Sequence, residues 1–148
     1  MSYSPDKRSN ELIIEVLVRR PHMICGTSLM RVGRTPSDTA LLNAAALVEL
    51  ENGLYRRVRL VFGGVNMEAT RLFSIERQLE GQPAAFPVNG QLLRSALEAS
   101  MNEFRPPSDT RVSGGYRRVC GMNLAYRALE EATSVAHWRN VVSSREGV

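Results

Sequence analysis

The stretch LLNAAALVELENGLYRRVRLVF, residues 41–62, decides the fold expected for this chain. At its centre Asn52-Gly53 is the strongest short sequence signal for a β-hairpin. The alanines before this pair favour a helix by propensity, yet their segment is short and ends at the turn. The sequence therefore predicts a strand over residues 41–50 that returns as a second strand over residues 54–62.

The returning strand alternates strictly, which is typical of a strand with one wet face and one buried face. We expect the wet face to carry Tyr55, Arg57 and Arg59. The opposite face is expected to carry Leu54, Val58, Leu60 and Phe62.

Two segments nearer the N-terminus also have strand patterns. Glu11 to Val18 (ELIIEVLV) is rich in β-branched residues and leucine and stops before Pro21. Ser28 to Gly33 alternates polar and apolar residues, as a half-buried strand does. Residues 1–10 are expected to form a disordered leader.

After the hairpin the apolar spacing becomes helical. We expect helices over about 68–80, 89–104 and 113–132, with 133–148 a C-terminal tail that is either a short extra helix or frayed. Strands followed by helices predict an α+β fold, a small antiparallel sheet of three to four strands with a three-helix bundle packed on it.

Composition excludes several classes of protein. At 148 residues the chain fits one domain, and no apolar run approaches the ~20 residues that span a bilayer. The net charge of +4 comes from arginines in scattered pairs, with Lys7 the single lysine. This pattern favours contacts with an acidic partner protein over nucleic-acid binding. The N-terminus lacks a secretory signal, so a cytoplasmic location without a membrane is expected.

No catalytic or metal-binding constellation stands out. His22 and His137 have no sequence neighbours that suggest a triad or a metal site, and Cys25 and Cys120 lie far apart. The pair at 63–64 lacks the spacing of a phosphate-binding loop and is interpreted as a tight corner. We therefore expect neither a catalytic residue nor a metal ligand.

Two motifs resemble one family. They are RVGRTPSDTA at 31–40 and SDTRVSGGYRR at 108–118. The chain resembles the C-terminal domain of the FAD-binding (medium) subunit of molybdenum hydroxylases, the xanthine dehydrogenase and carbon monoxide dehydrogenase group. There, a Lys-x-x-Arg…Asp-x-Ala segment opens the domain and Asp-x-Arg-x-Ser-x-x-Tyr-Arg opens its last helix. The resemblance assigns residues 11–132 to such a domain.

The resemblance implies a cofactor contact at Arg31 and Asp38. The family has a lysine near the flavin ring where this chain has Arg31, and a cation beside the isoalloxazine stabilises the anionic reduced flavin. The loop from Arg34 to Asp38 would line the flavin. The alternative is local: Asp38 caps or pairs nearby, and Arg31 is a surface residue of a strand.

The second motif, Asp109, Arg111, Tyr116 and Arg117, is expected to be structural. Ser108 or Asp109 can accept hydrogen bonds from unpaired N–H groups as the chain enters the last helix. Arg111 can bond several carbonyls or an acid at once, and we expect it to fix how that helix docks on the sheet.

The resemblance implies a component of an oxidoreductase that is not catalytic alone. FAD would be held only together with a flavin-binding N-terminal domain or subunit, because the glycine-rich segments that bind its pyrophosphate precede this domain in the family. An iron–sulfur subunit and a molybdopterin subunit would be the other partners in electron transfer. The alternative is a cofactor-free scaffold or protein-interaction domain that kept the fold and lost the flavin.

Overall fold

The computed structural model describes residues 10, 12, 14–18, 24–63 and 69–146. Four antiparallel strands form one sheet in sequence order: β1 (Cys25–Val32), β2 (Leu42–Glu51), β3 (Leu54–Gly63) and β4 (Thr70–Arg71). Three helices follow: α1 (Phe73–Leu79), α2 (Gly90–Ser100) and α3 (Gly114–Glu146). The predicted α+β fold, strands first and helices packed on them, is confirmed.

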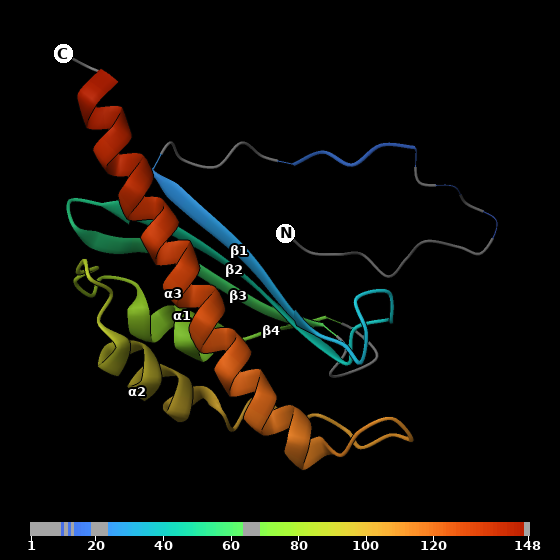
Figure 1. Cartoon of the computed structure of the whole chain (residues 1–148). Helices are drawn as coiled ribbons and strands as arrows, with labels where there is room; N and C mark the ends of the chain where they lie inside the picture. The colour runs from blue at the N-terminus through green and yellow to red at the C-terminus, as the bar shows by residue number, and fades with distance from the viewer. Residues whose placement is uncertain (1–9, 11, 13, 19–23, 64–68, 147–148) are drawn as a thin grey trace.

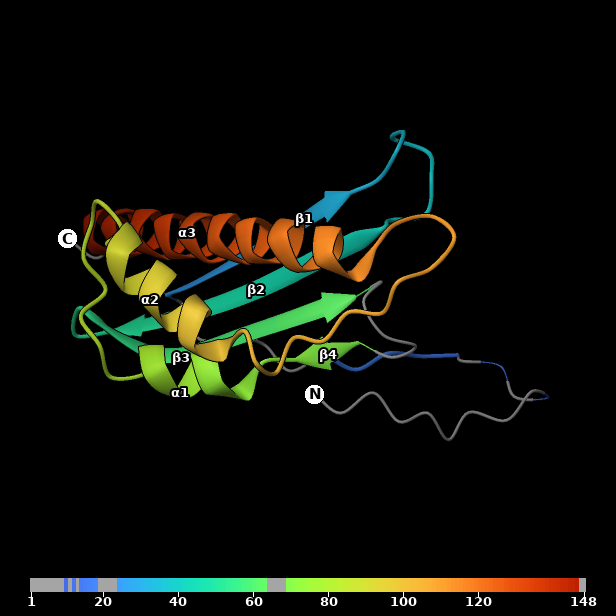
Figure 2. The ribbon, with the colours of Figure 1, turned by 90° about the horizontal axis from the view of Figure 1, so that it is seen from below.

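The long helix α3 crosses the sheet over β1 and β2, while α1 lies against β3 and α2 contacts both other helices (Figures 1 and 2). The core lies between the sheet and this helical layer. Its centre includes Val48 of β2, Leu60 of β3 and Leu129 of α3, each almost completely buried. In the described part of the chain, no helix is long and apolar enough to cross a membrane.

At Gly26 of β1, the backbone of α3 lies directly against the sheet. A Cβ atom at Gly26 would lie 1.8 Å from the carbonyl oxygen of Ala132 and 2.7 Å from the amide nitrogen of Ala136. The sheet-facing stripe of α3 is made of small residues, namely Ala125, Ala128, Ala132 and Ala136, all fully buried. Small residues on both sides let the helix backbone rest almost directly on the strand.

The hairpin forms as predicted, with Asn52 at φ 51° and Gly53 at φ 75°, the positive values that a two-residue turn requires. The expected faces of β3 are partly wrong, because the register shifts between Glu49 and Leu50. Glu49 pairs with Arg57 and Leu50 with Tyr55, so Arg56 is an extra, bulged residue.

Because of the bulge, the two residues before it face the opposite sides of the sheet from those predicted. Tyr55 is buried at 2% exposure on the side of Val58, while Leu54 is 41% exposed. The Tyr55 hydroxyl lies 3.3 Å from the Thr133 hydroxyl of α3, and burial raises the pKa of Tyr55. Residues 57–62 keep the predicted alternation.

One expected strand does not form, and three expected helices differ in extent. Residues 12 and 14–18 form no strand, because a strand needs a partner and they have none within the described chain. The helix expected from 68 begins at Phe73, since Thr70 and Arg71 pair with β3 instead. The last helix continues to Glu146 rather than ending at 132, because buried Thr133 and Ala136 continue its packed face. The middle helix begins at Gly90, capped by the Asn89 side chain.

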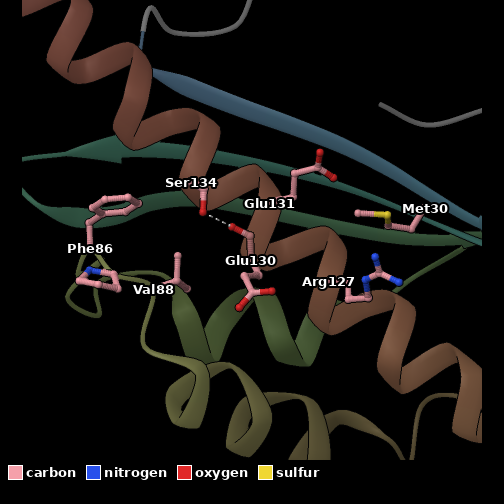
Figure 3. A pocket seen from close by; sticks show the side chains of 8 residues that line it. Met30, Phe86, Val88, Arg127, Glu130, Glu131 and Ser134 are labelled. Atoms are coloured by element: carbon pink, nitrogen blue, oxygen red, sulfur yellow. Dashed lines mark hydrogen bonds between the residues drawn. The ribbon is translucent and has the colours of Figure 1, made fainter.

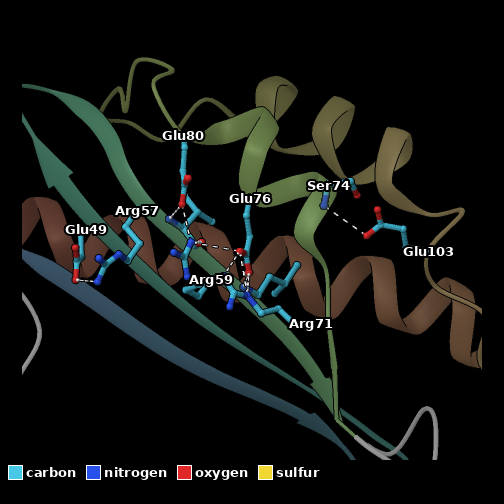
Figure 4. A network of polar contacts seen from close by, with 10 residues as sticks. Glu49, Arg57, Arg59, Arg71, Ser74, Glu76, Glu80 and Glu103 are labelled. Carbon is cyan, nitrogen blue, oxygen red and sulfur yellow. Dashed lines mark hydrogen bonds and ion pairs between the residues drawn. The ribbon is translucent and has the colours of Figure 1, made fainter. Parts of the chain in front are cut away.

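Carboxylates of α1 and of the residue that follows it cover the edge of β3 where β4 does not reach. Glu76 accepts a hydrogen bond from the Leu60 N–H at 3.2 Å, and Glu80 accepts one from the Val58 N–H at 3.0 Å. Arg59 bridges both carboxylates and Arg71 pairs with Glu76 at 2.6 Å (Figure 4). Side chains thus replace a further strand at this edge.

Candidate functional site

Arg31, the first of the two expected cofactor residues, lies near the end of β1 and holds the turn that follows. Its guanidinium donates a hydrogen bond to the carbonyl oxygen of Pro36 at 3.0 Å and a second to the carbonyl oxygen of Asp38. The bidentate geometry of a guanidinium suits two carbonyls of one turn. Arg31 therefore connects the strand to the 34–38 loop.

A glycine makes this arrangement possible. A Cβ atom at Gly33 would lie 2.9 Å from the Arg31 guanidinium and 3.1 Å from the Thr35 carbonyl oxygen. The loop closes where the Leu41 N–H donates to the Val32 carbonyl at 2.8 Å. A side chain at position 33 would push the arginine out of the turn.

Asp38 contributes its backbone to Arg31 and its side chain to Arg34. The Asp38 carboxylate lies 3.3 Å from Nε of Arg34, with the two side chains 35% and 70% exposed. Within the described chain, the positive charge of Arg31 faces neutral carbonyls and is not neutralised by a carboxylate. The loop is thus an exposed cationic tip whose shape is set by Arg31 and whose acid is already paired.

The second motif centres on Arg117. This residue of α3 is 2% exposed and donates to the Asp109 carboxylate at 2.6 Å and to the Pro107 carbonyl at 2.7 Å. Hydrogen bonds from Arg117 and from the backbone of Val112 and Arg111 hold the pKa of Asp109 well below its usual range. These contacts fasten the loop before α3 to the first turns of the helix.

Arg111 does not have the docking role that the sequence predicted for it. Its guanidinium reaches only Asp109 among the described residues, at 3.3 Å, and is 41% exposed. Tyr116 is 47% exposed, and its backbone N–H donates to the Ser113 hydroxyl at 3.2 Å. The prediction chose the wrong arginine of the motif, because sequence spacing does not show which one turns inward.

Of the two side chains expected to accept hydrogen bonds at the start of α3, Ser108 does so. The Ser108 hydroxyl accepts a hydrogen bond from the Gly114 N–H at 2.8 Å. Asp109 instead closes a local turn, accepting from the Arg111 and Val112 N–H groups at 2.9 and 3.0 Å. The loops that carry the two motifs emerge at the same end of the domain in both views (Figures 1 and 2).

Sequence reasoning did not find an open groove of about 540 Å³ over α3. Figure 3 shows Phe86 and Val88 on one side of the helix and Met30 of β1 on the other. The lining also includes Pro87, Arg127, Glu130, Glu131 and Ser134. No signal at the level of spacing joins these segments, because the groove is made by the tertiary packing of a loop and a strand.

The two carboxylates of the groove are engaged by neighbouring hydroxyls. Tyr126 donates to Glu130 at 3.0 Å, which raises the pKa of the Tyr126 hydroxyl, and Ser28 donates to Glu131 at 2.7 Å. They point apart (Figure 3), as expected for adjacent helix residues, and do not form an acid–base pair. Among the described residues, no group of three or more His, Cys, Asp or Glu could hold a metal.

Comparison with known proteins gives one family. The family model described as the CO dehydrogenase flavoprotein C-terminal domain matches residues 28–132, a range that contains both motifs. The glyceraldehyde dehydrogenase medium chain of Sulfolobus acidocaldarius is 28% identical over 131 residues, covering 87% of this chain and 44% of that protein.

Solved structures share the fold at lower identity. Carbon monoxide dehydrogenase from Hydrogenophaga pseudoflava superposes with a TM-score of 0.71 at 20% identity, over 80% of this chain and 40% of that one. Quinoline 2-oxidoreductase from Pseudomonas putida 86 gives 0.67 at 21% identity, over 76% and 38%. The chain thus spans less than half the length of each of these similar proteins.

Proposed function

This chain belongs to the family of CO dehydrogenase flavoprotein C-terminal domains, and we propose that it completes the flavin site of a molybdenum hydroxylase-type oxidoreductase. In this proposal the chain supplies the C-terminal part of the flavoprotein subunit and a share of the subunit interface. Glyceraldehyde dehydrogenase, carbon monoxide dehydrogenase and quinoline oxidoreductase are the similar proteins, and they indicate the class of enzyme rather than the substrate.

The residues of the 31–38 loop fit an aromatic group that gains negative charge when it is reduced. Arg31 is fixed by two carbonyls and its charge is not neutralised by a carboxylate in the described chain. A fixed cation costs little reorganisation when negative charge develops beside it. FAD, when bound, supplies the electron-transfer chemistry. Arg31 would favour its reduced form electrostatically, and Asp38 would hold the loop through its carbonyl.

The observation that carries this proposal is the pre-formed contact between Arg31 and the Asp38 carbonyl. It joins the two residues for which the family resemblance implies a cofactor contact. Because Asp38 engages Arg31 through its backbone, its carboxylate remains with Arg34 and does not cancel the charge of Arg31.

The chain would hold and cover the flavin rather than break bonds. The described residues offer no acid–base pair in the groove and no metal cluster. The remaining flavin contacts belong to a flavin-binding domain or subunit, and an iron–sulfur and a molybdopterin subunit would pass electrons to it.

The test is the visible absorption spectrum of the protein isolated from its source under gentle conditions. Flavin bands accompanied by iron–sulfur absorbance are expected, and the flavin signal should change on replacing Arg31. Arg118→Met, an exposed arginine of α3, is the control that should leave the spectrum unchanged. A colourless protein that purifies alone would contradict the proposal and favour a cofactor-free scaffold.

A further inference from the structure

The side of α3 that points away from the sheet exposes large apolar side chains to water. Because a helix turns by about 100° per residue, they fall on one stripe, opposite the alanines that pack on the sheet. They are Tyr116 (47% exposed), Val119 (66%), Trp138 (66%) and Val141 (50%). The helix forms the outer layer of the domain, and no other described element covers this stripe (Figures 1 and 2). Apolar side chains grouped in this way mark an interaction surface.

Two charged residues occupy the middle of the stripe, where the groove over α3 lies. Arg127 is exposed and projects from the helix (Figure 3), and within the described chain no carboxylate pairs with it. Glu130 accepts a hydrogen bond from the neutral Tyr126 hydroxyl at 3.0 Å, and no described cation forms an ion pair with it. Both charges are therefore available to an opposite charge on another molecule. We call these two residues and the four apolar ones the outer stripe.

The six residues of the outer stripe are arranged symmetrically along α3. Three pairs lie at equal distances on either side of the midpoint between residues 128 and 129, namely Tyr116 with Val141, Val119 with Trp138, and Arg127 with Glu130. Because the helix turns equally on both sides of that midpoint, the members of each pair also lie on opposite sides of the centre line of the stripe. When two such helices pack antiparallel about a two-fold axis through the midpoint, each residue faces the other member of its pair.

We propose that the outer stripe is the interface of a symmetric dimer, in which the α3 helices of two copies of this chain pack antiparallel. The two-fold axis places Arg127 of each copy against Glu130 of the other, so two opposite-charge pairs form at the centre. On each side of this centre, Trp138 of one copy packs against Val119 of the other and shields the charges from water. This inference goes beyond the proposed function and does not depend on a bound flavin.

The area of the outer stripe suits a reversible dimer. Between its first and last residues the helix rises by about 38 Å, and a strip of that length and one helix diameter wide covers about 400 Å² per chain. Phe86, Val88 and Met30 of the groove lie beside this strip and add to it (Figure 3). The total stays near or below the ~800 Å² per partner of a standard interface, so we expect dissociation in the micromolar range.

Sedimentation velocity of the full chain across the micromolar range tests the dimer, and charge reversal tests its geometry. Arg127→Glu and Glu130→Arg each place like charges opposite one another at both central contacts. Each variant alone should therefore raise the dissociation constant by about 100-fold or more. Arg118→Glu and Glu98→Arg make the same changes of charge at exposed positions off the stripe, and they should leave association unchanged.

Mixing the two stripe variants separates a contact between copies from a role within one chain. An equimolar mixture of Arg127→Glu and Glu130→Arg should dimerise again, because each reversed charge then faces the opposite sign in the other variant. The double variant should dimerise alone for the same reason. Circular dichroism checks that each variant is folded, and no function of these residues within a single chain predicts recovery on mixing.

Three outcomes overturn the inference. The first is a chain that remains monomeric throughout the concentration range. The second is association that neither single variant weakens, since the contact would then lie on another surface, such as the exposed apolar side chains before β1. The third is loss of the dimer in both variants without recovery in their mixture. Recovery in the mixture supports the inference, whereas the presence of flavin in the native preparation decides the proposed function separately.

Discussion

Arg117 and Asp109 form an ion pair of 2.6 Å in which the arginine is 2% exposed and the carboxylate is about one third exposed. The pair joins the first turns of α3 to the loop that precedes it. Because Arg117 also donates to the Pro107 carbonyl, one guanidinium fixes two points of that loop. A single inward-facing arginine thus fastens the start of the longest helix to the loop before it.

Replacing this arginine should loosen the start of α3. Arg117→Met keeps most of the side-chain volume but removes both hydrogen bonds, so we expect the melting temperature to fall by on the order of 5 °C. Arg118→Met, on the neighbouring exposed position, should change it by less than about 1 °C. Equal losses in the two variants, measured by circular dichroism, would contradict the role assigned to Arg117.

The same pair predicts an acid-dependent loss of stability. The pKa of Asp109 is lowered in the folded protein, first by its hydrogen bond to Arg117. Its contribution is therefore fully present above the unfolded-state pKa of about 4 and disappears as the pH falls from there through the lowered folded-state value. Asp109→Asn should flatten the decline in urea-unfolding midpoint below pH 4, and an unchanged decline would refute the linkage.

Gly26 should tolerate no side chain. Its Cβ position lies 1.8 Å from the Ala132 carbonyl oxygen, and the atoms in the way belong to helix backbone. Gly26→Ala should lower the free energy of unfolding by about 3 kcal/mol, because α3 must move off β1.

Gly115 provides a matched control, since no atom lies within 4 Å of its Cβ position. In the first turn of α3, Gly115→Ala should be neutral or stabilise the protein by up to about 1 kcal/mol. Urea unfolding of both variants checks the pair. A Gly26→Ala protein as stable as the unchanged chain would show that α3 does not rest on β1 as described.

Features that depend only on residues close together in the chain could be predicted from the sequence. The Asn52-Gly53 turn requires positive φ at both residues, so the hairpin around it could be placed without a structure. The cap of α2 by the Asn89 side chain is also local chemistry, although the expected helix included Asn89 instead of beginning after it. Tyr55 was assigned to the wrong face because a bulge arises from the register between strands, which no single strand contains.

The rest depends on tertiary contacts. Residues 12 and 14–18 have a strand pattern but form no strand, because no partner strand lies beside them in the described part of the chain. The inward arginine could not be chosen between Arg111 and Arg117, since both fit the motif. The close helix contact was not predicted, because the strand expected from Ser28 begins at Cys25 in the structure and Gly26 therefore lay outside the expected element.

Neutralising the buried carboxylate of Glu76 should destabilise the covered edge of β3. Glu76 is 3% exposed, accepts from the Leu60 N–H and pairs with Arg59 and Arg71. Glu76→Gln has nearly the same shape but loses the charge that both arginines face, so stability should fall by about 2 kcal/mol.

An exposed glutamate of α2 serves as the comparison. Glu98→Gln should alter the unfolding free energy by less than about 0.5 kcal/mol. Because an uncovered edge strand promotes association, light scattering of Glu76→Gln on mild heating should also rise before that of the control. Matching stabilities and scattering for the two variants would mean that Glu76 does not protect the edge.

Two substitutions distinguish the effect of the Arg31 charge from the effect of its hydrogen bonds. Arg31→Met removes both, so in the assembled flavoprotein the two-electron flavin potential should fall by about 30 mV, or ~1.4 kcal/mol, as a nearby cation is lost. Arg31→Lys keeps the charge and should shift the potential by less than about 10 mV. Both variants should speed amide exchange in the 34–38 loop, because neither restores two bonds to the Pro36 and Asp38 carbonyls.

Asp38→Asn tests the same loop without touching that contact, because Arg31 binds the Asp38 backbone. This variant breaks only the exposed pair with Arg34, so exchange in the loop should remain close to that of the unchanged protein. If Arg31→Met loosens the loop yet leaves the flavin potential unchanged, Arg31 acts as a structural connection alone. If the flavin potential falls in Arg31→Met but not in Arg31→Lys, the positive charge at position 31 must lie near the flavin.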